Sequence, residues 1–192
     1  MRRLVLLAAI ASLVACKGSD KKPTSGSAAT KPAADEPPRI SNHAFASASL
    51  SNVTSKAGPV DFAIALPIDV LKSPEVKDAY STWEAKAAWF DTPTISVQFS
   101  EFPMSPDSTG DTEPLGDDAK DRVIARAEKL ADGGYLNLDE RKDKQFFRLE
   151  VCRPAHDGKL CCSVVQRSDK PLDAFDEIVG FAEKICKSMK AK

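Results

Sequence analysis

The composition of residues 17–39 decides which part of this chain can fold. The stretch contains no Ile, Leu, Val, Met, Phe, Trp or Tyr. Such a segment cannot bury enough apolar surface to offset the conformational entropy lost on ordering. Its Pro, Gly and Ser residues are typical of a linker. We therefore expect a disordered tether over residues 16–40 and a globular domain over residues 58–192. Residues 41–57 are expected to be either tether or a short strand.

A short apolar run precedes the tether. Leu4–Ala15 is twelve residues long, carries no charge and follows Arg2-Arg3. A helix of that length spans about 18 Å, which is too short for a hydrocarbon core of about 30 Å. A basic start followed by a short apolar region is typical of a secretory signal peptide. Residues 1–15 are therefore predicted to be removed on export.

The apolar run ends in Leu13-Val14-Ala15-Cys16, which resembles the lipobox of bacterial lipoproteins. In that family the cysteine thiol receives a diacylglycerol, and a peptidase then cuts just before the cysteine. The resemblance implies that Cys16 becomes the lipidated first residue of the mature chain. Two or three acyl chains hold a protein firmly on a membrane, whereas one chain binds marginally. The alternative is ordinary cleavage after Ala15, which leaves a free thiol.

The charge balance argues against nucleic acid as a partner. Removal of residues 1–15 takes away two arginines and leaves 25 basic and 28 acidic residues, a formal charge of −3. The sequence has no basic run or densely basic face of the kind that binds nucleic acid. The remaining chain is long enough for one domain with a substantial core.

Alternating patterns predict an antiparallel sheet. Val60–Leu66 and Thr94–Phe102 alternate apolar and polar residues, as half-buried strands do. Ser81–Phe90 is also interpreted as a strand, although an Ala-rich helix competes there. Asp157-Gly158 is a strong hairpin-turn signal. The predicted strands are 60–66, 81–90, 94–102, 135–140, 145–153 and one that begins near Leu160.

Three helices are predicted beside these strands. Ser73-Pro74-Glu75 has the form of a helix start, for a helix of about two turns. Asp117–Asp132 has apolar residues at helical spacing and is followed by Gly133-Gly134 as a stop signal. Asp173–Met189 carries a continuous apolar stripe. The expected fold class is α+β, with an antiparallel sheet of about six strands and helices packed on it.

Setting Cys16 aside leaves four cysteines, an even number that suggests two disulfides in an exported domain. If Asp157-Gly158 forms a two-residue turn, Cys162 lies on the apolar face and points at the last helix. Cys152 and Cys161 then lie diagonally across the hairpin on the other face. The predicted pairs are Cys162–Cys186 and Cys152–Cys161.

Motifs for metal binding and catalysis are weak. Cys152, His156, Cys161 and Cys162 have a zinc-like spacing, but neighbouring strand residues point to opposite faces, so Cys161 and Cys162 cannot share an ion. Acids between residues 107 and 118 are out of phase with a calcium loop. The sequence has no phosphate-binding loop or nucleophile elbow. We predict no metal, cofactor or catalytic residue, and keep a cryptic hydrolase with paired carboxylates as a remote alternative.

One face of the predicted sheet is the candidate interaction surface. Strand alternation gives it a polar character, with Phe90 and Phe146 interspersed. Such a face is either solvated or covered by a further helix or a partner. A lined pocket between sheet and helix would instead favour a small-molecule or lipid binder. The polar residues predicted on this face are Glu84, Lys86, Gln98, Ser100, Arg148 and Glu150.

The order of elements resembles the PsbP-like fold, which also occurs in DcrB-like lipoproteins. A strand ends at Ala65-Leu66-Pro67, and a hairpin runs through Trp89–Val97. A helix, two hairpins and a closing helix ending in Lys184–Lys190 follow. The resemblance covers residues 58–190 and implies an antiparallel sheet with helices packed on it and a non-catalytic binding or assembly role. No site residue carries over from the family.

Together these features predict a lipoprotein of the bacterial cell envelope. Its membrane attachment is expected through Cys16, and its domain is expected to be an interaction module for an envelope protein. Lys17, in place of Asp, resembles the pattern that sends lipoproteins to the outer membrane. The expected location is therefore the outer membrane, with the domain periplasmic or at the cell surface.

Overall fold

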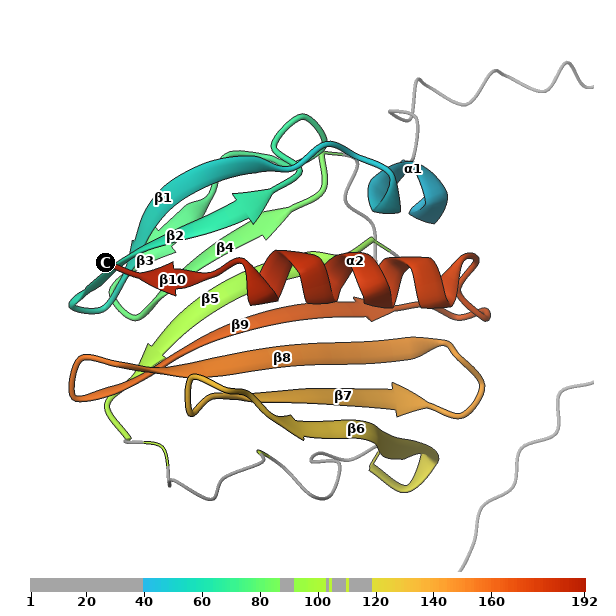
Figure 1. The fold of residues 1–192 in the computed structure, drawn as a ribbon. Helices are drawn as coiled ribbons and strands as arrows, with labels where there is room; N and C mark the ends of the chain where they lie inside the picture. The colour runs from blue at the N-terminus through green and yellow to red at the C-terminus, as the bar shows by residue number, and fades with distance from the viewer. Residues whose placement is uncertain (1–39, 87–91, 103, 105–109, 111–118) are drawn as a thin grey trace, which may run out of the picture. The chain divides into compact units, whose positions relative to one another are not determined.

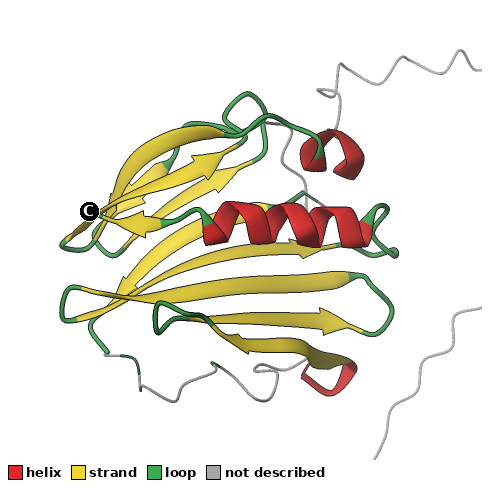
Figure 2. Ribbon diagram, in the orientation of Figure 1, coloured by secondary structure: helices red, strands yellow, loops and turns green. Residues whose placement is uncertain are grey.

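Ten strands and two α-helices form the part of the chain described by the computed structural model, which comprises residues 40–86, 92–102, 104, 110 and 119–192. Strands dominate these residues (Figure 2). The helices are α1 (Asn42–Ala46) and α2 (Phe175–Lys187), with a 3₁₀ turn at Ala119–Asp121. The strands are β1 (Ser51–Ala57), β2 (Val60–Leu66), β3 (Glu75–Lys77), β4 (Tyr80–Glu84), β5 (Thr94–Ser100), β6 (Arg122–Lys129), β7 (Tyr135–Arg141), β8 (Phe146–Ala155), β9 (Gly158–Arg167) and β10 (Lys190–Ala191).

The strands form two antiparallel sheets that lie in separate layers (Figure 1). The large sheet has seven strands in the order β3-β4-β5-β9-β8-β7-β6, and the small sheet has the order β1-β2-β10. The small sheet and α2 cover the same face of the large sheet. The fold is therefore α+β and mostly antiparallel sheet, as predicted, but with seven and three strands in place of about six.

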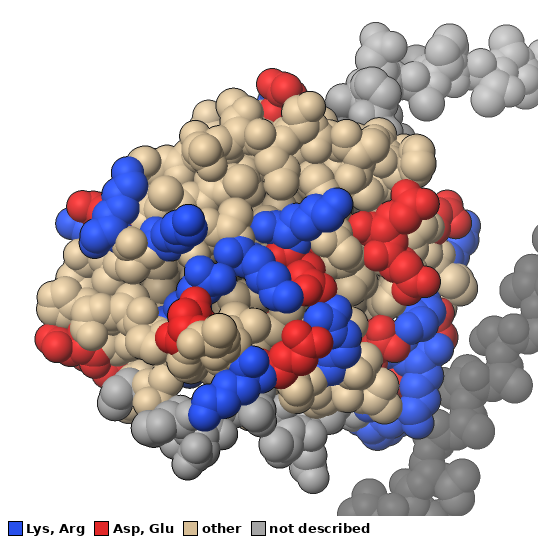
Figure 3. Space-filling view, in the orientation of Figure 1, with Lys and Arg blue, Asp and Glu red and all other residues tan. Residues whose placement is uncertain are grey.

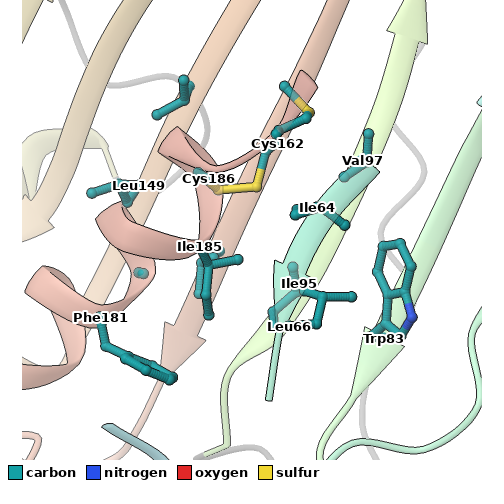
Figure 4. Close-up of a cluster of buried hydrophobic side chains, with 14 of the residues drawn as sticks. Ile64, Leu66, Trp83, Ile95, Val97, Leu149, Cys162, Phe181, Ile185 and Cys186 are labelled. Carbon is teal, nitrogen blue, oxygen red and sulfur yellow. A yellow bond between two sulfur atoms is a disulfide. The ribbon is translucent and has the colours of Figure 1, made fainter. Parts of the chain in front are cut away.

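The hydrophobic core fills the space between the two layers. Ile64 of β2 packs toward Ile95 of β5, while Ile185 of α2 packs toward β8 and β9 (Figure 4). Phe62 and Trp83 meet edge to face, with ring centroids 6.4 Å apart. Burial of such side chains is the main favourable contribution to folding, about 1.5–3 kcal/mol each.

Several predicted elements are confirmed because their apolar periodicity is unbroken. β2 has the predicted bounds, and β5 ends two residues before Phe102. β7 and β8 form the predicted hairpin. α2 is shorter than predicted at both ends, but its apolar stripe is buried as expected. No helix among the described residues is long and apolar enough to span a membrane.

The hairpin of β8 and β9 forms with a different turn from the one predicted. His156 and Asp157 are the loop residues, and Ala155 pairs with Gly158. His156 takes a positive φ of 51°, which a two-residue hairpin loop requires. The register therefore shifts by two residues. Since side chains alternate with a period of two, every residue keeps its predicted face.

The helix predicted over Asp117–Asp132 is wrong for its described part. Ala119–Asp121 forms one 3₁₀ turn, and Arg122–Lys129 is strand β6, paired with β7. Gly133 lies in the turn between the two strands, with a φ of 82°. The helical spacing of small apolar residues was compatible with both structures, and pairing with a strong neighbouring strand decided between them.

The helix predicted at Ser73-Pro74-Glu75 is also wrong. Glu75–Lys77 forms the short strand β3, which pairs with β4 through a tight turn. The strand predicted over Ser81–Phe90 exists as β4 and as a bridge from Ala85 to Leu71. The remainder of that prediction, including Trp89 and Phe90, lies outside the described residues.

Residues 41–57, predicted to be either tether or a short strand, form helix α1 and strand β1 and pack onto the domain. Ser41 caps α1 by accepting a hydrogen bond from the Ala44 N–H. Phe45 is fully buried and meets Phe181 of α2 edge to face at 5.5 Å. β1 then pairs with β2 along its whole length.

Candidate functional site

Strand β9 carries two disulfide-bonded cysteines, and their bonds lie on opposite sides of the large sheet. Cys162 is bonded to Cys186 of α2 inside the core, and both are fully buried (Figure 4). Cys161 is bonded to Cys152 on the other side. These are the pairs that the sequence predicts. The register shift places Cys152 directly opposite Cys161, with a Cα–Cα distance of 4.0 Å, rather than diagonally.

A possible metal-ligand group lies beside the second disulfide. A carboxylate oxygen of Glu150 and the sulfurs of Cys152 and Cys161 lie within 4.8 Å of one another. The two sulfurs are bonded to each other, so neither is a thiolate that a metal ion could use. In this oxidised form the group is therefore not a metal site.

The outer face is the face of the large sheet that points away from α2 and the small sheet. Five of the six predicted interaction residues lie on it: Glu84 of β4, Gln98 and Ser100 of β5, and Arg148 and Glu150 of β8. Lys86 follows β4, and its main chain and side chain bond to the carbonyls of Val70 and Asp69.

The outer-face residues form two separate groups. Glu84 and Arg148 belong to one cross-strand row, with β5 and β9 between them, so about 14 Å of sheet separates them. Glu84 pairs with Lys72 at 3.1 Å in an exposed position. Glu150 accepts from Arg148 at 2.6 Å and from the Tyr135 hydroxyl at 3.3 Å. The predicted residues therefore do not converge on one site.

A nearly buried ion pair on the outer face was not predicted. The side chains of Arg122 and Asp139 are only 7% and 9% exposed, with 3.4 Å between Nη1 and Oδ2. The Arg122 guanidinium also lies 5.0 Å from the ring centroid of Phe146, and that of Arg167 lies 5.5 Å from it. The sequence did not predict this pair, because Arg122 lies in the segment that was predicted to be a helix. Only the pairing of β6 with β7 brings Arg122 beside Asp139.

Part of the outer face is covered by the chain itself. Gly110 lies so close to Tyr135 and Asn137 that a Cβ atom at residue 110 would collide with both side chains. Tyr135, Asn137 and Asp139 are all buried. Of the two possibilities that the sequence left open, a solvated or a covered face, the second holds at Tyr135 and Asn137.

A polar hollow of about 620 Å³ lies where α1 meets the start of α2. Asn42 fixes this junction, since its amide accepts from Gln166 at 2.8 Å and donates to the Asp173 carbonyl at 3.1 Å. His43 Nδ1 lies 2.9 Å from a carboxylate oxygen of Glu177, and both side chains are largely exposed. The hollow is open and lined mainly by polar residues, which suits water better than an apolar ligand.

Cys16 lies outside the described residues, as do the acids at positions 107, 111, 113, 117 and 118. No protein-family model matches the chain, and no curated protein matches it.

Proposed function

We propose that this chain is a lipid-anchored protein of the bacterial cell envelope whose domain is a non-catalytic interaction module. The observation that carries the proposal is the pair of disulfides in a domain that follows Leu13-Val14-Ala15-Cys16. Disulfides persist in oxidising compartments, which exported proteins reach and cytosolic proteins do not. The lipid on Cys16 would anchor the chain in the membrane, and Lys17 next to it favours sorting to the outer membrane.

An interaction role fits the shape of the described domain better than the two alternatives. Side chains fill the space between α2 and the large sheet, where a small-molecule or lipid binder would need a lined pocket. The charged groups on the outer face pair with one another, as in Arg148–Glu150 and Arg122–Asp139. A hydrolase would need a cleft with two carboxylates aimed at a common point.

The PsbP-like assignment belongs to the same proposal. An antiparallel sheet, two successive hairpins and a closing helix packed on one face support it. The small sheet, the absence of a helix over Arg122–Lys129 and the two disulfides depart from the expected pattern. The proposed role does not depend on the family assignment.

Lipid attachment can be tested by metabolic labelling with an alkyne fatty acid in a bacterial host, followed by membrane sedimentation. The full chain should take up label and sediment with membranes, and Cys16→Ala should do neither. A double variant, Cys152→Ala with Cys161→Ala, controls for the loss of other cysteines and should keep the label. An unlabelled wild-type chain in the soluble fraction would refute the anchor.

The interaction role can be tested by crosslinking in cells with the same chains. We expect one abundant envelope protein to be captured by the lipidated chain and lost with Cys16→Ala. If neither form captures a protein, the interaction role is refuted, while the labelling result still stands.

A further inference from the structure

Four strands form the edges of the two sheets: β3 and β6 in the large sheet, and β1 and β10 in the small sheet. An edge strand exposes unpaired main-chain groups that invite another strand to pair with it. Proteins usually protect such edges with charged side chains, proline, bulges or very short strands.

Three of the edges are protected. β6 has a register shift between Ile124 and Arg126, and charged residues recur along it. β3 has only three residues, two of which are Glu75 and Lys77. β10 has two residues and begins with Lys190. Each therefore presents a short, irregular or charged edge.

β1 has none of these protections over most of its length. It pairs with β2 over seven residues without a register shift. Residues 40–55 contain no Asp, Glu, Lys or Arg, in a chain that is 29% charged, and no Pro. In Figure 3 the surface over β1 and β2 is mostly uncharged, whereas charged side chains crowd α2 and the strands below it. Among the described strand edges, β1 alone is long, regular and almost uncharged.

The register shows which main-chain groups of β1 point outward. Ala57 pairs with Val60 across a two-residue turn, so residues 51, 53, 55 and 57 bond to β2. The residues between them direct their N–H and C=O groups away from β2. The Ser81 hydroxyl donates a hydrogen bond to the Lys56 carbonyl at 2.7 Å, which is consistent with an outward direction for that carbonyl. The outward main-chain groups of Asn52 and Thr54 have no hydrogen-bond partner among the described residues, whereas the Thr54 hydroxyl accepts from Lys192 Nζ at 2.9 Å.

We propose that this edge pairs with β1 of a second copy of the chain, antiparallel about a two-fold axis at Val53. In that register Asn52 faces Thr54 of the second copy. The N–H of each residue then donates to the C=O of the other, so all four outward main-chain groups of the pair are bonded. Lys56 falls opposite Leu50, so no like charges meet. The two small sheets join into one of six strands. Because the pairing uses the same edge on both copies, the assembly closes as a dimer.

A second copy suits this edge because the edge is complementary to itself. An uncharged strand desolvates at low cost against another uncharged strand, whereas a charged partner would leave its charges without opposite charges on β1. Leu50 and Ile68 are 36% and 44% exposed, and both lie at the end of the β1–β2 pair. In the dimer the aliphatic stem of Lys56 from the second copy covers Leu50. The inference goes beyond the proposed function and holds whether or not Cys16 carries lipid.

Sedimentation velocity of the full chain in mild detergent, over a concentration series, tests the dimer. Wild type should shift from monomer to dimer as concentration rises. Asn52→Lys with Thr54→Lys places two lysines opposite two lysines across the axis and should weaken association at least tenfold. Ala125→Lys with Ala127→Lys adds the same two charges to the protected edge of β6 and should leave the dimer unchanged. The Cys16→Ala chain without detergent should behave as wild type, which separates this result from that of the lipid test.

Asn52→Pro gives a second variant that removes one outward N–H and none of the bonds to β2. It should also weaken association, with circular dichroism confirming that the domain still folds. A photo-crosslinking residue at position 52 should yield a homodimer, and the same residue at position 127 should not. A wild-type chain that remains monomeric at every concentration, or a double-lysine variant that dimerises like wild type, would overturn the proposal.

Discussion

Cys161 and Cys162 are neighbours in the chain, yet each is bonded on a different side of the large sheet. Cys161 is joined to Cys152 on the outer face, and Cys162 is joined to Cys186 of α2 in the core. Because strand residues alternate between faces, the two bonds cannot exchange partners without unfolding β9. One strand is thereby fixed to its hairpin partner on one face and to a helix on the other.

Removal of either disulfide should destabilise the domain, and the inner one should matter more. The chain-entropy relation predicts about 3.5 kcal/mol for the separation of 24 residues between Cys162 and Cys186, and about 2.7 kcal/mol for the separation of 9 between Cys152 and Cys161. The inner pair also loses buried packing. Urea unfolding of the two double Cys→Ala variants measures the difference. Equal loss of stability would contradict the prediction, since the loop lengths alone give the inner bond about 0.8 kcal/mol more.

Glu183 of α2 should make stability depend on pH. The hydrogen bond from Arg126, first, and that from Lys187 lower its pKa from 4.5 to about 2. A lowered pKa gives stability that is present above about pH 4.5 and lost as pH falls toward 2. Arg126 is partly exposed, so we expect Glu183→Gln to cost about 1–2 kcal/mol at pH 6.

Urea unfolding at pH 6 and near pH 2 checks this prediction. The stabilities of wild type and Glu183→Gln should converge at the acid end. Glu128→Gln is the matched control, since Glu128 also binds Arg126 but is 44% exposed. Its effect should stay below about 0.5 kcal/mol. A difference for Glu183→Gln that persists at pH 2 would point to packing rather than charge.

Asn42 should hold α1 on the domain. Its side chain bonds to the buried Gln166 amide and to the Asp173 carbonyl. Asn42→Ala leaves the buried Gln166 amide with one partner fewer, so we expect a loss of about 1–2 kcal/mol and faster hydrogen exchange in α1. His43→Ala removes only the exposed contact with Glu177 and serves as the control. Similar exchange rates for the two variants would contradict this account.

Removal of one partner of the Arg122–Asp139 ion pair should lower the free energy of unfolding more than replacement of both partners. Both side chains are nearly buried, so Asp139→Ala removes the carboxylate 3.4 Å from a guanidinium that stays buried, and it should cost about 3–4 kcal/mol. Combining it with Arg122→Met removes both charges, and the double variant should be less destabilised than the single one. A double-mutant cycle by urea unfolding measures the coupling. Simple additivity would mean that water screens the pair.

The sequence predicted the elements whose periodicity is unambiguous. β2, β5 and α2 repeat apolar residues at a spacing that only one structure satisfies, so local information was sufficient. Cysteine faces were also predictable, because a two-residue error in the turn leaves each side chain on the same face.

Other features depend on contacts between distant segments. The spacing of Val123, Ala127 and Leu130 suits a helix, and pairing with β7 made the segment a strand. The Arg122–Asp139 pair follows from that strand and was missed with it. α1 was missed because Phe45 has no periodic apolar neighbours and is held by Phe181, far away in the sequence.

The small sheet joins an early part of the chain to a late one, since Phe62 of β2 pairs with Ala191 of β10. Cys186, needed for the inner disulfide, is also synthesised late. The inner layer therefore stays incomplete until almost the whole chain has left the ribosome. Pairings between such distant segments form slowly, because the loop must close before its contacts contribute. A nascent chain of this design cannot close its core until nearly all of its residues are available.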